Sequence, residues 1–321
     1  MSFYQNFTND ILEINENNFL DKSLELFDYQ YHTNDTYRSY CIHLKINKDE
    51  IRQLEDIPFL PIEFFKTHQI KSENWSPQKT FLSSGTTQNT RSKNLVRDVE
   101  FYHQISKSIF EHFFGPLNQY RILALLPSYQ EQGHSSLVEM VDHFMSHSQI
   151  GSGFLSSDDS SLPSIFNDSV EKILIGVSYA LLDLALLDIP NKHLKIMETG
   201  GMKGRKKEIT RAHLHQELCQ GFNINHINTE YGMTELTSQA YAKTDGLLRF
   251  PPWAKCLFRD INDPFTYLNT KSNGGINIID LANVSTCAFI ETKDLGIAMD
   301  NNYFNVIGRF DNSDIRGCNQ L

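Results

Sequence analysis

The chain has 321 residues, of which 40% are hydrophobic, and a formal net charge of -10 at pH 7. These values predict a globular protein with a large buried core, and the acidic balance argues against a general nucleic-acid binder, which usually has a basic surface or arm. The N-terminus has no cationic stretch followed by an apolar core, so we expect no secretory signal and a cytoplasmic protein. The five cysteines are scattered without a CxxC pair, which favours reduced thiols over a zinc site.

Residues 1–75 have the pattern of a mainly helical lead-in segment. The segment ends in DIPFLPIEFFKTHQIKS, where Pro58 and Pro61 are expected to interrupt any helix. Residues 76–321 are predicted to form the core of the protein. Within this core the pattern becomes β-rich from about residue 247, and a short tail follows at 312–321.

From residue 79 short apolar runs alternate with helical patterns. The predicted strands are KTFLSS, YRILALLP, KILIGVS and HLKIMETGG, and the helical patterns between and after them include VRDVEFYHQISKSIFEHFF, SSLVEMVDHFMSH and RAHLHQELCQGF. This alternation predicts an α/β fold with a largely parallel sheet. Ser136 and Glu139 are placed to form a capping box. The most apolar run, ILIGVSYALLDLALLDI, is interrupted by Asp183 and Asp188, so it predicts a strand and a helix and no membrane span.

The stretch FLSSGTTQNTRSK, residues 81–93, places hydroxyl groups around one glycine with two cations close behind. Such groups suit a polyphosphate, because glycine lets the backbone approach while hydroxyls and amides donate to the oxygens. The stretch is not the GxxxxGK[ST] P-loop, so a plain surface loop remains an equal interpretation at this point. The candidate ligands are Ser83, Ser84, Gly85, Thr86, Thr87, Arg91 and Lys93.

Four further stretches follow in order, namely METGGMKGR, TEYGMTE, IETKDLG and IGRFD. Together with SSGTT they resemble the signature motifs of the adenylate-forming superfamily, which activates carboxylic acids with ATP. PFLPIEFFK, LALLPSYQEQGHSSLVEMVDH, EYGMTELTSQAY and the terminal DIRGC narrow the resemblance to acyl-protein synthetases of the LuxE type, and beyond them to phenylacetate:CoA ligases. The resemblance runs from about residue 50 to the end.

The resemblance implies an α/β fold: the large N-terminal domain of the adenylate-forming, acyl-CoA synthetase-like fold, with parallel sheets flanked by helices and a β-rich C-terminal part. Most of that superfamily continues into a small mobile C-terminal domain, and we expect this domain to be absent here because the sequence ends soon after IGRFD. The implied activity is ATP-dependent, AMP-forming activation of a fatty or aryl carboxylic acid with Mg²⁺, a fatty acid being the first expectation. The acyl group would pass to Cys318 in DIRGC and then to a protein or thiol acceptor, a reductase being one candidate.

The resemblance also assigns roles near the phosphates. The SSGTT residues would hold the β- and γ-phosphates, with Arg91 or Lys93 in place of the usual loop lysine. This sequence departs from the family pattern because Gln88 stands where a second glycine is usual. Lys203 is a candidate for the cation that the absent small domain would otherwise supply.

The resemblance also assigns nucleotide-binding roles to residues of the later motifs. Tyr231 would stack on adenine and Thr234 would contact the α-phosphate, while Glu235 would bind Mg²⁺, which prefers oxygen ligands. Asp294 would accept hydrogen bonds from both ribose hydroxyls, with Arg309 near the same ribose. The adenine-binding loop and the turn after Tyr231 add Gly200, Gly201, Met202 and Gly232.

The carboxylate pocket is expected near LPSYQEQGHSS, with Tyr129, His134 and Ser135 as candidates. The same GHSSL suggests a rival serine hydrolase, but Leu137 stands where the GxSxG elbow needs its second glycine. Two alternatives to an acyl-protein synthetase stay open: a CoA ligase, and a non-catalytic module that binds nucleotide or acyl groups. We expect no nucleic-acid partner.

Overall fold

The computed structural model describes residues 2–84, 91–126, 133–156, 158–200, 209–243, 246–268 and 271–310. The helices are α1 (Phe3–Asn9), α2 (Phe19–Thr33), α3 (Asp35–His43), α4 (Phe64–Thr67), α5 (Val99–Phe114), α7 (Ser136–Ser146), α8 (Leu162–Asn167), α9 (Ser178–Ala185) and α10 (Arg211–Phe222). The strands are β1 (Leu60–Pro61), β2 (Lys79–Leu82), β3 (Lys93–Val96), β4 (Arg121–Leu125), β5 (Gly153–Phe154), β6 (Lys172–Val177), β7 (Leu194–Thr199), β8 (Asn228–Tyr231), β9 (Ala240–Ala242), β10 (Ala254–Arg259), β11 (Asn273–Asp280), β12 (Phe289–Ala298) and β13 (Phe304–Arg309).

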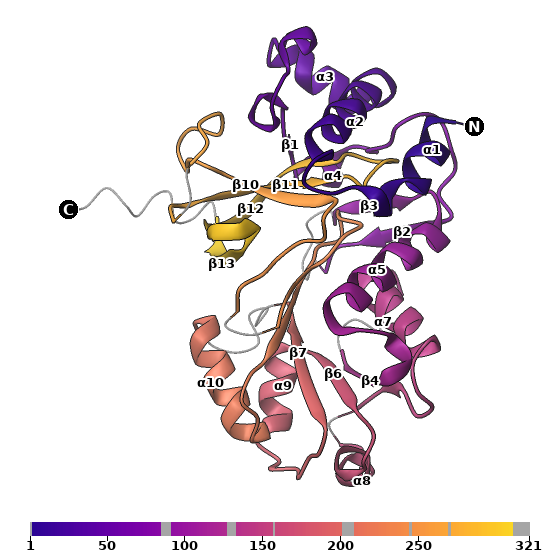
Figure 1. Cartoon of the computed structure of the whole chain (residues 1–321), viewed down its shortest axis with the longest axis vertical. Coiled ribbons are helices and arrows are strands. Elements are labelled where there is room, and N and C mark those ends of the chain that lie inside the picture. The colour runs from indigo at the N-terminus through magenta and orange to yellow at the C-terminus, as the bar shows by residue number, and fades with distance from the viewer. Residues whose placement is uncertain are drawn as a thin grey trace, which may run out of the picture.

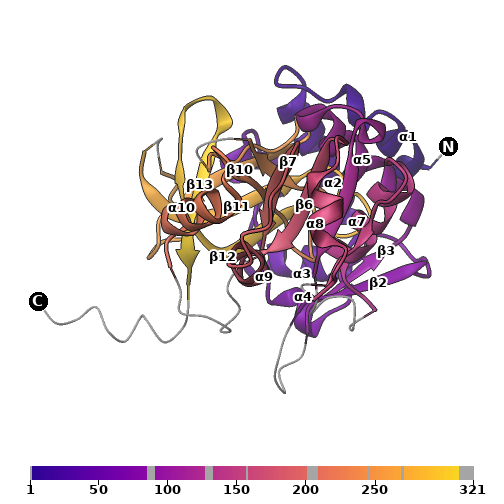
Figure 2. The same ribbon diagram turned by 90° about the horizontal axis from the view of Figure 1, so that it is seen from below.

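The larger sheet has the order β5-β4-β6-β7-β8-β9, and only β9 runs antiparallel to its neighbour. In two views α9 and α10 lie on one side of β6 and β7, and α5 and α7 lie on the other (Figure 1, Figure 2). Every residue of β6 is buried, as expected for a central parallel strand covered on both faces. The alternation of strands and helices predicted from the sequence is therefore confirmed, including the β6–α9 division of the most apolar run.

The second sheet has the order β1-β12-β11-β10, with β13 paired to β12. The N-terminal helices α2 and α3 lie beside this sheet in Figure 1, and their contacts with it are specific. The Gln30 side-chain amide donates to the Asn283 carbonyl at 2.8 Å, and the Tyr37 ring stacks on Phe289 with centroids 6.1 Å apart. The helical lead-in thus packs against the β-rich part from the far end of the chain. The domain boundaries at 75 and 247 stay predictions.

The hairpin of β2 and β3 is antiparallel, with Leu82 paired to Lys93. Helix α5 follows almost directly, and its start is capped by Asp98, whose carboxylate accepts from the Phe101 amide at 3.1 Å. The hairpin is therefore anchored by a helix that packs on the parallel sheet.

The capping box predicted at Ser136 and Glu139 is wrong. Helix α7 is capped one residue earlier, by Ser135, whose hydroxyl accepts from the Val138 amide at 3.4 Å. The Glu139 carboxylate instead forms ion pairs with Lys79 and His103, and two such partners outcompete a single backbone amide.

Within the described ranges, none of the helices has the length and apolar character needed to cross a membrane.

Candidate active site

The predicted nucleotide residues cluster where β7 and β8 end. In open α/β sheets ligands bind in the crevice outside the carboxyl ends of the parallel strands. Strand β7 ends at Thr199, directly before Gly200, and β8 ends at Tyr231, directly before Gly232. Because β7 and β8 are neighbours in the sheet, these two chain turns lie at the same edge.

Tyr231 and Asp294 are in direct contact although 63 residues separate them in the sequence. The Tyr231 hydroxyl donates to Asp294 Oδ2 at 2.7 Å, and its ring packs edge-on against Phe250 and Phe304 with centroids 6.3 and 5.8 Å away. Burial, followed by the nearby Asp294 charge, raises the pKa of Tyr231 well above its usual range, so the hydroxyl stays a donor at neutral pH. The larger sheet and the second sheet are thereby joined at this point.

Arg309 completes this group from β13. Its Nε atom lies 3.3 Å from Asp294 Oδ1, and the two residues are register partners across β12 and β13. The Asp294 side chain is 13% exposed and that of Arg309 is 66% exposed, so both are reachable from solvent. Three residues predicted from separate motifs, namely Tyr231, Asp294 and Arg309, are therefore brought together.

Glu235 is the predicted Mg²⁺ ligand, and it is only 5% exposed. Burial raises the pKa of its carboxyl, while the neighbouring Ser92 hydroxyl and the Arg309 guanidinium oppose that shift. A cation that bound beside Glu235 would lower the pKa again. In the part of the chain that the structure describes, no three acidic, histidine or cysteine side chains form a metal-binding group. An ion beside Glu235 would take further oxygen ligands from other groups, of which the phosphates of a bound nucleotide are one source.

The backbone after Glu235 is held by two residues outside the predicted motifs, Asp280 and Asn283. Asn283 donates from its side-chain amide to the Glu235 carbonyl at 2.9 Å and accepts from the Thr237 amide at 2.9 Å. Asp280 accepts from the amides of Thr237 and Ser238 at 3.0 and 2.8 Å. The backbone from Glu235 to Ser238 is thus fixed by Asp280 of β11 and by Asn283, which follows β11.

The hairpin β2–β3 is tied to the same segment. Asn94 on β3 donates to the Thr234 carbonyl at 2.8 Å, and Ser92, two positions earlier, lies beside Glu235. The residue between them, Lys93, is exposed, because alternate residues of a strand face opposite sides. The only sequence signal for Ser92 and Asn94 is this alternation of small polar residues with cations, which is too common to have identified them.

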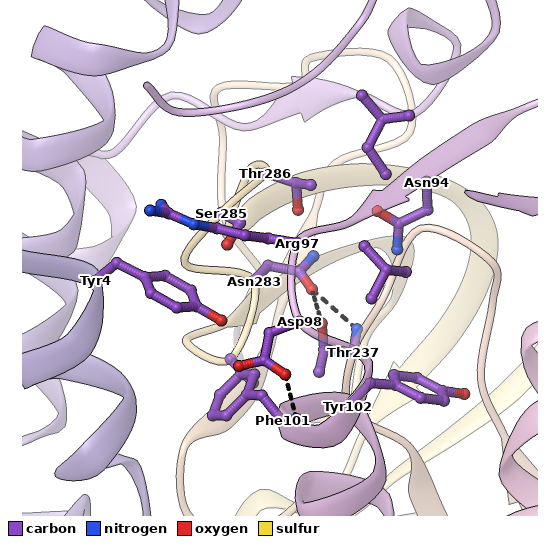
Figure 3. Close-up of a pocket in the computed structure, with 13 residues that line it drawn as sticks. Tyr4, Asn94, Arg97, Asp98, Phe101, Tyr102, Thr237, Asn283, Ser285 and Thr286 are labelled. Carbon is purple, nitrogen blue, oxygen red and sulfur yellow. Dashed lines mark hydrogen bonds between the residues drawn. The ribbon is translucent and has the colours of Figure 1, made fainter. Parts of the chain in front are cut away.

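A small cavity lies behind this tie, lined by Asn94, Arg97, Asp98, Thr237 and Asn283 among others (Figure 3). Its volume is about 30 Å³, which is room for about one water molecule. The figure shows Asn283 joined to Thr237 within it, and Asn94 facing it from β3. The cavity is too small for a nucleotide or an acyl chain, so it belongs to the support of the site.

The phosphate loop is described only at its two ends. The Ser83 amide donates to the Ser92 carbonyl at 3.0 Å, and the Ser92 amide donates to the Ser83 hydroxyl at 3.0 Å, which closes the hairpin across the loop. Ser84 ends the first described side, and Arg91, half-buried, begins the second. Gly85, Thr86 and Thr87 lie outside the described residues. The phosphate-binding role of the loop stays a prediction.

Gly200 has the left-handed backbone that the predicted loop start needs, with φ of +69°. Its carbonyl accepts from the Ser178 hydroxyl at 3.1 Å. Gly201, Met202 and Lys203 lie outside the described residues, so the remainder of the adenine-binding loop stays a prediction.

At the predicted acyl end, Tyr129 lies outside the described residues. His134 is exposed, and its carbonyl accepts from the Leu82 amide at 2.9 Å, which places it beside the hairpin. The Ser135 hydroxyl caps α7, a structural task that does not depend on substrate. Cys318 also lies outside the described residues, and its acylation stays a prediction.

Comparison with known proteins agrees with this geometry. Residues 9–110 match the family model described as acyl-protein synthetase, LuxE. The long-chain-fatty-acid–luciferin-component ligase of Vibrio harveyi is 24% identical over 307 residues, which cover 84% of this chain and 76% of that protein. The ligase of the same name from Aliivibrio fischeri is 23% identical over 304 residues, covering 85% of this chain and 77% of that protein. This chain is therefore similar in sequence to the LuxE-type acyl-protein synthetases.

The fold of this chain is also similar to solved structures of adenylate-forming ligases. A 2-hydroxyisobutyryl-CoA ligase in complex with 2-HIB-AMP and CoA superposes with a TM-score of 0.67 at 11% identity, over 92% of this chain and 68% of that one. ATP-bound MatB from Rhodopseudomonas palustris gives a TM-score of 0.54 at 15% identity, over 74% of this chain. The match spans about half of the MatB chain, 49%. The predicted adenylate-forming fold is confirmed.

Proposed function

We propose that this chain activates a carboxylic acid with ATP, forming an acyl-adenylate and releasing pyrophosphate. The observation that carries the proposal is the meeting of Tyr231, Asp294 and Arg309 at the carboxyl edge of the parallel sheet. An aromatic ring beside a reachable carboxylate and a guanidinium suits an adenosine group with its ribose hydroxyls and phosphates. The similarity to LuxE-type proteins and the adenylate-forming fold support the same chemistry.

The chain's own residues would position the reactants more than exchange protons with them. Attack of a carboxylate on the α-phosphate brings anions together, so the reaction needs charge neutralisation and alignment. Thr234 and the SSGTT hydroxyls would donate to phosphate oxygens, with Arg91, Lys93 or Lys203 as candidate cations. The hydrogen bonds from Asn94 and Asn283 would hold the segment with Thr234 and Glu235 still during this step.

The donors near Glu235 fit Mg²⁺. A carboxylate oxygen and phosphate oxygens are the ligands that this ion prefers, and a cation would neutralise the Glu235 charge that burial disfavours. Bound there, the ion would supply neutralisation of the phosphates. Glu235 would hold it, and Ser92 and Asn94 would keep the hairpin beside it.

The acid is proposed to be fatty, because both curated relatives are named long-chain-fatty-acid–luciferin-component ligases. The acyl group would then pass from the adenylate to the Cys318 thiolate as a thioester, with AMP as the leaving group, and onward to a protein or thiol acceptor. A second candidate is a CoA ligase, which the similarity to a CoA ligase structure over 92% of this chain favours.

The test is ATP–pyrophosphate exchange with the purified chain across a panel of fatty and aryl acids, with hydroxylamine trapping for weak substrates. Exchange with fatty acids that is independent of CoA supports the proposal. AMP formation that requires CoA selects the CoA ligase. ATP binding without exchange on any acid would contradict catalysis and leave a binding module.

The Cys318 step has its own test, which uses a radiolabelled fatty acid with ATP. Cys318→Ser is expected to keep the exchange reaction and to lose covalent acyl label. The matched control is Cys219→Ser, a half-buried thiol on α10, which is expected to keep the label. Unchanged labelling of the Cys318→Ser protein would contradict the role.

A further inference from the structure

Glu230 is a buried carboxyl that has no part in the proposed chemistry. It precedes Tyr231 in β8 and is 6% exposed. The charges and dipoles that act on it come from Glu198 and Thr199, and no cation of the described residues is among them. Burying a carboxyl with no cation beside it among the described residues costs free energy, which points to a role for Glu230 at the edge of the site.

One contact of Glu230 is with the end of β7. The Thr199 hydroxyl donates to Glu230 Oε2, and the two residues are register partners across β7 and β8. Thr199 is directly followed by Gly200, where the predicted adenine-binding loop begins with a left-handed backbone. The bond therefore fixes the end of β7 relative to β8 at the point where both strands leave the sheet.

A second contact of Glu230 is with the turn after β8. A Cβ atom added to Gly232 would lie 2.5 Å from Glu230 Oε1, far inside van der Waals contact. The carboxyl therefore packs directly against the backbone of this turn. Glycine at 232 makes room for the Glu230 side chain, and the segment that carries Thr234 and Glu235 starts from that packed position.

Two further elements, and a second residue of β7, complete the surroundings of Glu230. The Glu230 charge contributes to the raised pKa of Tyr102 on α5 and of Tyr241 on β9. Glu198 of β7 is the anion that acts on Glu230 itself. Burial, the largest cause, raises the pKa of Glu230 to about 7, Glu198 adds to the rise, and the Thr199 hydroxyl opposes it. The carboxyl is thus enclosed on each side, and its two oxygens face the two chain turns.

We propose that Glu230 is a positioning residue that joins the two turns of the nucleotide site, holding the β7 end through Thr199 and the 231–235 turn through Gly232. The inference rests on the proposed function. In this proposal Glu230 does not contact ATP. It keeps the two turns at a fixed spacing before ATP binds. Loosening that link lowers the fraction of molecules ready to bind, so it weakens ATP binding more than it slows turnover.

The test uses Thr199→Val, which removes the hydroxyl and keeps the shape. The Kd for ATP by calorimetry and the KM for ATP in the exchange assay are each expected to rise about tenfold, with kcat changed less than about threefold. Thr199→Ser, which restores the hydroxyl, is expected to return both to within about twofold. The matched control is Thr229→Val, an equally buried threonine that faces the other side of β8 towards His215, with no expected change.

Unchanged Kd and KM in Thr199→Val, with only a lowered melting temperature, would overturn the inference, because Glu230 would then be purely structural. Should Thr199→Val not fold, Thr199→Ala takes its place with the same expectation. The Kd does not depend on turnover, so a wild-type chain that binds ATP without exchange contradicts only the proposed catalysis. A wild-type chain that binds no ATP would overturn both.

Discussion

The buried Glu230 predicts an unusual dependence of stability on pH, which Glu230→Gln should remove. In the folded chain burial raises the pKa of this carboxyl from 4.5 to about 7, whereas the unfolded chain leaves it in water. Below pH 4.5 the carboxyl is protonated in both states and costs nothing. As the pH rises to 7 the unfolded state ionises first, so the folded state loses stability progressively across that window and stays at the lower level above it.

The magnitude follows from the width of this window. A carboxyl whose pKa rises from 4.5 to about 7 on folding loses about 3 kcal/mol of unfolding free energy across this window. Glutamine cannot ionise, keeps the shape and still accepts from Thr199, so the variant avoids this loss. The free energy of unfolding of Glu230→Gln relative to the wild type should therefore rise by up to about 3 kcal/mol between pH 4.5 and pH 8, or roughly 5 °C in melting temperature.

Urea unfolding of both proteins, followed by circular dichroism at several pH values, measures this difference. Glu100→Gln is the control, because that side chain is 87% exposed, and the same comparison should change by less than about 0.5 kcal/mol. A difference between Glu230→Gln and wild type that stays constant from pH 4.5 to pH 8 would refute the reasoning, since it would mean that the carboxyl ionises in the fold as it does in water.

Three other substitutions test the site. Glu235→Ala should lower ATP–pyrophosphate exchange about a hundredfold or more, because it removes the proposed metal ligand, and near-normal exchange would contradict that role. Tyr231→Phe should keep the ring packing and lose the bond to Asp294, costing about 1.5–3 kcal/mol of unfolding free energy in urea titrations, whereas an unchanged value would mean that water replaces the bond. Gly232→Ala should lower the free energy of unfolding by about 1–3 kcal/mol through overpacking against Glu230. Adding Glu230→Ala to the same chain should recover part of that loss, and a double variant that recovers none of it would contradict the contact.

The local pattern of the sequence was enough to predict much of the fold. Strand β6 and helix α9 follow from a continuous apolar run that changes to three- and four-residue spacing, a signal that depends only on near neighbours. The order of the motifs likewise predicted the adenylate-forming fold, which the similar structures confirm. The capping of α7 was misplaced by one residue, because Glu139 is taken by Lys79 and His103 from other elements.

Only the tertiary structure decided how the site is held. The hydrogen bond from Tyr231 to Asp294 joins residues 63 positions apart, and that from Asn283 to the Glu235 carbonyl joins residues 48 positions apart. Local sequence patterns do not predict contacts at such separations. Nothing in the local sequence distinguishes Asn94 from other strand residues, and its hydrogen bond to the Thr234 carbonyl is evident only in the structure. The sequence by itself determined which residue types are present and in what order, because local spacing encodes helices, strands and motifs. Which side chains meet was decided by the packing of two sheets, which no single segment encodes.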